Sequence, residues 1–165
     1  MSTFVSVGNA TQPFPRLLDA IAKLAPSLPQ PVTVQTGCNT FASSTCRSVN
    51  FLSMESFTAH IREAELLILH AGAGTVINAM QAGKLPIVVP RRACYGELVD
   101  DHQLGFARAL AAVGKVVVVE DMRQLTDAVK DVQIRQARQL SSSEQPALVS
   151  MVERVLADCA KQFGR

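Results

Sequence analysis

Short runs of apolar, mostly β-branched residues alternate along this chain with longer segments whose apolar residues recur every three or four positions. The first pattern is typical of buried strands and the second of amphipathic helices. Their alternation predicts an α/β fold, a Rossmann-like parallel sheet with helices on both faces. The predicted strands are residues 4–7, 32–35, 49–52, 66–69, 86–89 and 116–119, and the predicted helices are residues 14–24, 54–63, 74–82, 98–112, 122–139 and 146–162.

Local signals define where some of these elements end. Residues 36–48 are small and polar, which predicts a loop. Ser53 is a candidate N-cap for the helix at 54–63, with Ser56 as its rival, and Gly83 is a candidate C-cap for the helix at 74–82. The length of 165 residues fits a single domain, 1–165, with its C-terminal helices starting near residue 122.

Composition excludes several classes of protein. Sixteen basic and fourteen acidic side chains give a net charge of +2, too balanced to indicate nucleic-acid binding or an anionic membrane surface. No apolar run approaches the roughly 20 residues of a transmembrane helix, and the N-terminus lacks the basic segment of a signal peptide. We therefore expect a cytoplasmic protein with reduced cysteines. Their spacing contains no CxxC motif, so we expect no metal site. The cysteines are Cys38, Cys46, Cys94 and Cys159.

The segment HAGAGT, residues 70–75, carries the most distinctive chemistry. Gly72 and Gly74 fall between a buried strand and a helix, where free N–H groups and the helix dipole favour an anion such as phosphate. The alternative is that these glycines only permit close helix–strand packing. Ile77 breaks the dinucleotide fingerprint GxGxxG, which disfavours a dehydrogenase, and the lysine of a Walker loop is absent.

A second motif, YGELVDDHQLGFARAL, begins at Tyr95. Together with HAGAGT at this spacing it resembles the donor-binding, C-terminal domain of family 28 glycosyltransferases over residues 4–121. The similarity includes small stand-alone members: the soluble subunit of the two-part UDP-N-acetylglucosamine transferase and bacterial exopolysaccharide counterparts. The resemblance implies the donor-binding half of a GT-B glycosyltransferase.

The resemblance also implies roles for individual residues. The Gly-rich turn would cradle the UDP diphosphate, a His-Gln pair would contact the donor sugar, and backbone before the helix at 54–63, near Ser53, would receive the uracil. The sequence departs from the pattern at Asn78, where many relatives have a carboxylate that holds the ribose hydroxyls. The candidate donor-binding residues are Gly72, Ala73, Gly74, Thr75, Asn78, His102, Gln103, Met54, Gly8 and Asn9.

Several residues have two interpretations. His70 is either a structural histidine or a proton-transfer group. Arg91 and Arg92 either attract a diphosphate or are solvated loop charges, and Asp101 is a possible N-cap. The apolar residues of 146–162 either form a docking surface or pack on the sheet of this chain.

The resemblance implies an inverting, metal-independent UDP-sugar glycosyltransferase subunit, with the UDP-sugar as substrate and no cofactor. The chain has room for only one domain, so we expect a membrane-associated partner chain to supply the lipid-linked acceptor and the general base. The protein would then be peripheral to the membrane through that partner. The alternative is a non-catalytic nucleotide-sugar-binding or regulatory module.

Overall fold

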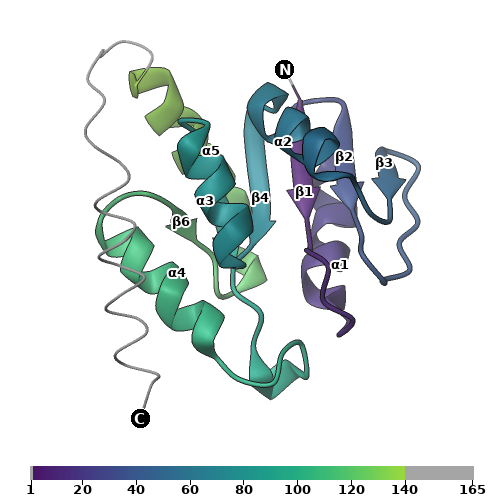
Figure 1. Ribbon diagram of the computed structural model, residues 1–165. Coiled ribbons are helices and arrows are strands. Elements are labelled where there is room, and N and C mark those ends of the chain that lie inside the picture. The colour runs from purple at the N-terminus through teal and green to yellow at the C-terminus, as the bar shows by residue number, and fades with distance from the viewer. Residues whose placement is uncertain (1, 140–165) are drawn as a thin grey trace.

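A six-stranded parallel sheet forms the centre of the computed structural model, which describes residues 2–139 (Figure 1). The strands lie in the order β3-β2-β1-β4-β5-β6, and each neighbouring pair is parallel. This is the order of the classic doubly wound fold. The strands are β1 (Thr3–Ser6), β2 (Val32–Gln35), β3 (Cys46–Val49), β4 (Leu66–His70), β5 (Ile87–Val89) and β6 (Val117–Val118).

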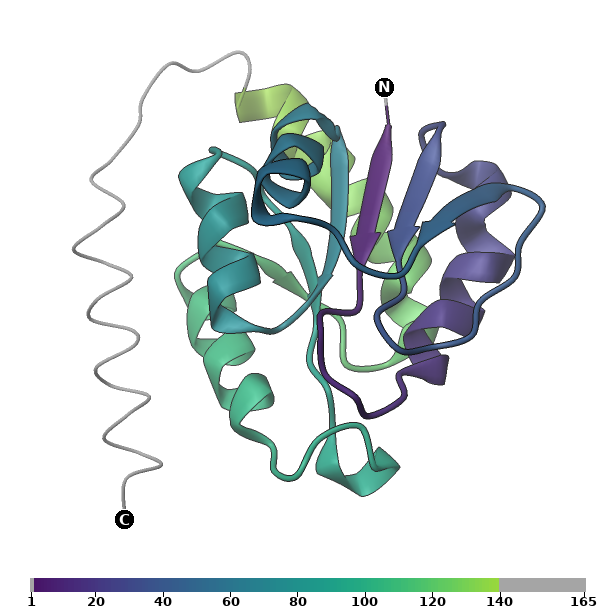
Figure 2. The same cartoon turned by 45° about the vertical axis from the view of Figure 1, so that its right-hand side comes forward.

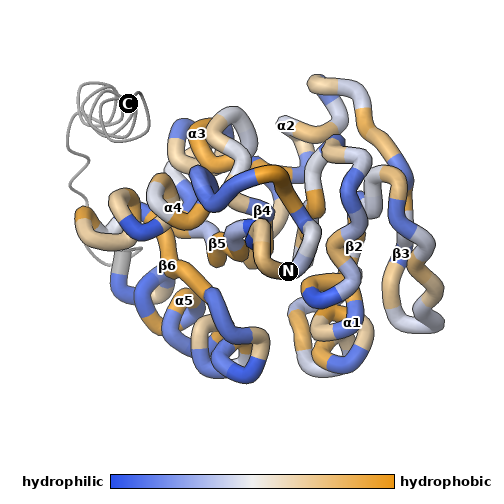
Figure 3. The backbone as a smooth tube through the Cα atoms, turned by 90° about the horizontal axis from the view of Figure 1, so that it is seen from below, coloured by the Kyte–Doolittle hydropathy of each residue, from blue (hydrophilic) through white to orange (hydrophobic). Residues whose placement is uncertain are grey.

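Helices cover both faces of the sheet, as the sequence predicts. Seen end-on, α1 and α5 lie on one side of the strands, and α2, α3 and α4 lie on the other (Figure 3). The bounds are α1 (Pro15–Leu24), α2 (Met54–Glu63), α3 (Ala73–Gln81), α4 (His102–Ala112) and α5 (Leu125–Gln139), with 3₁₀ turns η1 (Ala25–Ser27), η2 (Ala93–Tyr95) and η3 (Met122–Gln124).

Successive residues of a strand enter opposite core layers. In β4, Leu66 and Ile68 pack with the residues of α1 and α5, whereas Leu67 and Leu69 pack with those of α2 and α3. Because both faces are covered, all four side chains are buried. This explains why β4 reads as a continuous apolar run instead of an alternating one.

The direction of strand addition reverses between β1 and β4. β1 is followed by β2 on one side of it, and β4, on its other side, is followed by β5. Ligands of such sheets bind beyond the carboxyl ends of the strands at this switch point. The segments that follow β1, β4 and β5 leave from the lower end of the sheet in the views of Figures 1 and 2.

Two strand predictions need correction. β3 is Cys46–Val49, not 49–52, because it is a polar edge strand whose side chains are half-buried or exposed and whose position the apolar pattern does not reveal. β6 is limited to Val117–Val118 and is half-buried, whereas the sequence predicts a buried strand at 116–119. Edge position explains both differences, since an edge strand has only one neighbour to cover it.

The helix predicted at 98–112 begins only at His102. Before it, Gly96 has a left-handed φ of +67° and turns the chain, and the Asp100 carboxylate accepts the His102 N–H at 3.1 Å. The predicted N-cap Ser53 is confirmed, since its Oγ accepts the Ser56 N–H at 3.2 Å.

The remaining predictions concern thiols and membranes. Cys38, Cys46 and Cys94 are free thiols, and Cys159 and the helix predicted at 146–162 lie outside the described residues. Within residues 2–139, no helix is long and apolar enough to cross a membrane.

Candidate functional site

The Gly-rich turn joins β4 to α3 at the carboxyl edge of the sheet. Gly72 is the N-cap residue of α3 and offers no side chain to the free N–H groups of the first helical turn. The first bond of the helix runs from Val76 N to Gly72 O at 3.0 Å. Ala73 and Gly74 are exposed. The turn therefore presents the N–H groups and positive dipole end of α3 to solvent, which is the arrangement that binds phosphate.

The two glycines of this turn have different surroundings. A Cβ on Gly72 would overlap Nε2 of His70, and one on Gly8, whose φ is +79°, would lie 2.5 Å from the same ring. A Cβ on Gly74 would meet nothing within 4 Å. Close packing therefore accounts for Gly72, as one interpretation of the sequence proposed, but it does not account for Gly74. The structure adds that close packing also accounts for Gly8.

The loop between β1 and α1, residues 7–14, is called the β1 loop here. The ring of His70 fills the space between this loop and the Gly-rich turn. Its Nδ1 is buried without a hydrogen-bond partner. Desolvation, and then the nearby positive charge of Arg91, lower the pKa of His70 to about 4. The ring is therefore neutral at pH 7. A group with this pKa is a poor general base near neutrality, which favours the structural interpretation of His70.

A buried chain of hydrogen bonds positions the β1 loop. Ser6 Oγ donates to Gln35 Oε1 at 2.8 Å, and Gln35 Nε2 donates to Asn9 Oδ1 at 3.0 Å. Gly8 N donates to Ser6 Oγ at 3.2 Å. Gly8 is buried and Asn9 is exposed. Both predicted site residues are thus held at the switch point, next to the turn.

The segment between β5 and α4 carries the His-Gln pair. Gln103 is buried, and its Oε1 accepts the Arg91 N–H at 3.1 Å. Because the Arg91 N–H needs an acceptor, this bond fixes which way the side-chain amide of Gln103 is turned. Its Nε2 therefore points away from the Arg91 N–H. Within the described residues, no hydrogen bond of Nε2 is found, so this donor remains available to a ligand. The sequence does not reveal the link to Arg91.

His102 lies on the surface at the first residue of α4. Its Nδ1 and its backbone N both contact the Asp100 carboxylate. These contacts, first the backbone N–H and then the ring, lower the pKa of Asp100. Asp101 occupies the N-cap position without capping the helix by its side chain. Its carboxylate instead accepts the Ala93 N–H at 2.8 Å.

Neither arginine after β5 is a simple solvated loop charge. Arg91 is completely buried. Arg92 is half-buried, 3.4 Å from the carboxylate of Asp101 and 3.8 Å from that of Glu120. The interpretation of both as solvated charges is therefore wrong, and the burial of Arg91 keeps it from direct contact with solvent.

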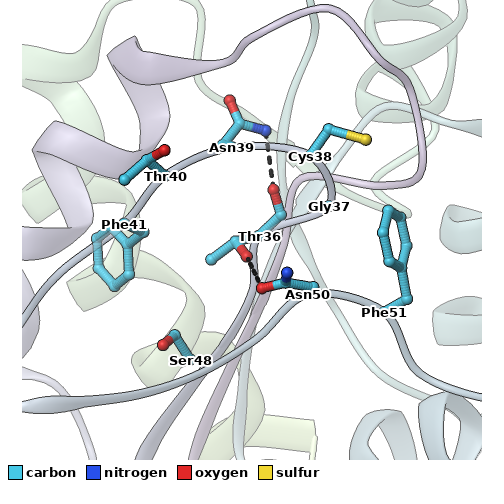
Figure 4. A pocket seen from close by; sticks show the side chains of 9 residues that line it. All are labelled: Thr36, Gly37, Cys38, Asn39, Thr40, Phe41, Ser48, Asn50 and Phe51. Atoms are coloured by element: carbon cyan, nitrogen blue, oxygen red, sulfur yellow. Dashed lines mark hydrogen bonds between the residues drawn. The ribbon is translucent and has the colours of Figure 1, made fainter.

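A pocket of about 550 Å³ opens at the carboxyl ends of β2 and β3 (Figure 4). Its shape is held by Asn39 Nδ2, which donates to Thr36 O at 2.8 Å, and by Thr36 Oγ1, which donates to Asn50 Oδ1 at 3.4 Å. The sequence indicates only a small, polar loop here. The lining residues are Thr36, Gly37, Cys38, Asn39, Thr40, Phe41, Ser48, Asn50 and Phe51.

The pocket connects the β1 loop with the start of α2. A Cβ on Gly37 would lie 2.7 Å from Gly8 O, so the two loops touch. On the other side, Phe51 leads directly to Ser53 and to Met54, a residue that is 71% exposed. The predicted uracil region and the predicted diphosphate region are thus joined along one edge of the sheet.

Thr75 and Asn78 lie farther along α3. Both are half-buried, and Asn78 follows Gly74 by four residues, which places it on the same helix face. Its backbone carbonyl accepts the Ala82 N–H at 3.1 Å. Together the turn, α3, Gln103 and the pocket offer an exposed helix N-terminus, side-chain amides and a cavity along one edge of the sheet. Within the part of the chain that the structure describes, no group of three or more His, Cys, Asp or Glu residues could hold a metal ion.

Comparison with known proteins adds independent information. Residues 2–158 match the glycosyltransferase family 28 C-terminal domain. Over 75 residues the chain is 33% identical to the UDP-N-acetylglucosamine transferase subunit ALG13 of Yarrowia lipolytica, covering 46% of this chain and 34% of that relative. The match thus spans about a third of the length of the relative.

The fold of this chain is similar to parts of solved glycosyltransferase structures. The glycotransferase of kitacinnamycin superposes with a TM-score of 0.60 at 16% identity, over 98% of this chain and 38% of that one. The glycosyltransferase SnogD from Streptomyces nogalater superposes with a TM-score of 0.47 at 20% identity, over 96% of this chain and 44% of that one. The predicted fold, a Rossmann-like half of a GT-B glycosyltransferase, is confirmed.

Proposed function

This chain belongs to the glycosyltransferase family 28 C-terminal domain family, and on that basis we propose that it is the donor-binding subunit of a two-component, inverting UDP-sugar glycosyltransferase. It would act on a lipid-linked acceptor in polysaccharide synthesis. The observation that carries the proposal is the open N-terminus of α3, where Gly74 has free space in place of a packing partner.

The proposed binding mode uses the whole carboxyl edge. The UDP diphosphate lies on Gly72, Ala73, Gly74 and Thr75, and the uracil lies near the start of α2 beside Met54. Gln103 Nε2, the donor left over after Oε1 binds Arg91, is available to a sugar hydroxyl. The UDP-sugar is the substrate, and no cofactor is needed.

The chemistry follows from this placement. An acceptor hydroxyl attacks the anomeric carbon and the bond to UDP breaks, so negative charge develops on the departing diphosphate. Oriented N–H groups and a helix N-terminus stabilise such charge without a metal ion. The general base is proposed to come from the partner, since the low pKa of the buried His70 makes it a poor base near neutrality.

The localisation follows from the same proposal. The subunit would be cytoplasmic and would reach the membrane through its acceptor-binding partner. The name of the Yarrowia lipolytica relative describes it as a subunit, which supports a multi-chain enzyme.

A non-catalytic nucleotide-sugar-binding or regulatory module is the second candidate. The observation that favours it is Asn78, which shares a helix face with Gly74. An amide can hold a ribose hydroxyl, but it lacks the charge-assisted strength of a carboxylate.

Nucleotide binding tests the proposal directly. The protein is expected to bind UDP more tightly than ADP or NAD, with or without EDTA, because the turn recognises the diphosphate and the α2 region recognises uracil. Isothermal titration calorimetry of the three nucleotides measures this preference. Equal affinities, or binding that appears only with magnesium, would contradict the proposal.

Gln103→Glu tests the contact with the donor sugar. The variant keeps an oxygen acceptor for Arg91 N and removes the Nε2 donor, so the preference for UDP-sugar over UDP is expected to fall by about fivefold, roughly 1 kcal/mol. UDP carries about one negative charge more than a UDP-sugar, so the added carboxylate would repel UDP more strongly and would by itself raise the preference for the UDP-sugar. A fall in that preference therefore reports the lost sugar contact. The exposed Gln124 provides the matched control Gln124→Glu, which should leave the ratio unchanged. An unchanged ratio in Gln103→Glu would place the sugar elsewhere.

A further inference from the structure

The side chain of Arg91 crosses the end of β4 underneath the loops of the candidate site. Val89 of β5 pairs with His70 of β4, and β4 lies between β5 and β1. Nevertheless, Arg91 Nη2, two residues beyond Val89, donates to Val7 O at the end of β1 at 2.8 Å. The guanidinium therefore spans the switch point from one side to the other, and it does so completely buried.

This guanidinium connects the β1 loop with the segment between β5 and α4. On the β1 side it donates to Val7 O and, from Nη1, to Gln12 O at 2.8 Å. On the other side Nη1 donates to Glu97 O at 3.0 Å, while the Arg91 backbone N donates to Gln103. The Cζ atom lies 4.6 Å from the centroid of the Phe14 ring, which supports it from below.

Among the described residues, no carboxylate forms a salt bridge with the guanidinium of Arg91. All three acceptors of its guanidinium are backbone carbonyls. The carboxylate of Glu97 is already engaged by Arg16, at 3.0 Å from Nε and 2.9 Å from Nη2, and by the Arg92 N–H at 3.0 Å. Two guanidinium groups thus share one carboxylate in this region.

The electrostatics agree with this geometry. Burial lowers the pKa of Arg91, and the charge of Glu97 opposes that effect. The charge of Arg91 in turn contributes to the low pKa of His70, so its field reaches the ring that separates Gly8 from Gly72. In a medium of low dielectric constant, such a field acts over a longer distance than it does in water.

We propose that Arg91 is the positioning residue of the donor site, a buried guanidinium that fastens the β1 loop to the β5–α4 segment and leaves one positive charge beneath the diphosphate. This rests on the proposed function, because it assumes that the anion at the turn is the diphosphate of a nucleotide. Arg91 acts through the loops and through its field, without contact to the ligand.

Three variants separate these effects. Arg91→Met removes both the charge and the hydrogen bonds, and Arg91→Lys keeps a cation but cannot reach three carbonyls. Arg108→Gln is the matched control, since it also removes one positive charge but from an exposed side chain paired with Glu120. The measurements are the affinities for UDP and for uridine, the pKa of His70 by NMR, and the amide hydrogen exchange of residues 8–12 without ligand.

In Arg91→Met, the ratio of UDP affinity to uridine affinity is expected to fall about tenfold, since only the diphosphate senses the charge. The pKa of His70 should rise, and the amides of residues 8–12 should exchange faster. A residue that only braces the fold would weaken both ligands equally and leave the ratio intact. Arg108→Gln should behave as the wild type does in all three measurements.

If Arg91→Met fails to fold, Arg91→Lys still tests the proposal. We expect faster exchange in residues 8–12, with the pKa of His70 kept low by the lysine charge and the affinity ratio largely retained. Wild-type exchange in this variant, or an unchanged ratio in a folded Arg91→Met, would overturn the proposal. Failure of the wild type to bind UDP would instead refute the proposed function, while exchange and the pKa of His70 would still test the role of Arg91.

Discussion

Gly74→Val is expected to abolish detectable UDP binding while the protein remains folded. A Cβ at this position meets no atom within 4 Å beyond its chain neighbours and its own helix backbone, so a valine side chain should project into the space where a diphosphate approaches the N–H groups of α3. Valine is also a better helix former than glycine, so the stability of α3 should not decrease. Calorimetry with UDP and urea unfolding measure binding and stability separately.

Two further variants make this test specific. Ala59→Val places the same side chain on the exposed face of α2 and should leave UDP binding unchanged, while lowering the free energy of unfolding by only about 0.5 kcal/mol through helix propensity. Gly72→Ala should instead lower the free energy of unfolding by about 1–3 kcal/mol, because its Cβ would overlap His70 and force the ring to move. If folded Gly74→Val binds UDP as the wild type does, the turn has no role in nucleotide binding.

The chain by itself is expected to transfer no sugar, and membranes that carry its partner subunit are expected to restore transfer to a lipid acceptor. The edge of this sheet offers donor contacts, but an inverting reaction also needs a base that works near pH 7. His70, with a pKa of about 4, cannot supply it efficiently. The apolar residues of 146–162, outside the described residues, are a proposed docking surface.

Transfer of labelled sugar to a lipid-linked acceptor measures this dependence. The reactions compare the purified chain, the partner membranes, and the two together, with Gly74→Val as the inactive donor-site control. Turnover by the purified chain alone would refute the two-component proposal. Binding of UDP-sugar without any transfer in the combined reaction would favour the non-catalytic alternative.

The sequence alone was sufficient to predict the fold class and the place of the turn. Three consecutive segments carry this information: the run Leu66–Leu69, the small residues after it and the helix that follows. Most of their apolar positions are buried, so the pattern predicts the elements. The N-cap Ser53 is equally local, because its bond reaches only to Ser56. Such features depend on backbone geometry over a few residues, which a sequence pattern captures.

The tertiary structure decided which residues face one another across the carboxyl edge. The pattern could not distinguish Gly72 from Gly74, because the difference lies in the ring of His70 and in the open space beside α3. It could not place Arg91 either, whose acceptor Val7 O is 84 residues away. Contacts of this kind depend on strand order and register, and those follow from the packing of the whole sheet, not from any local run of residues.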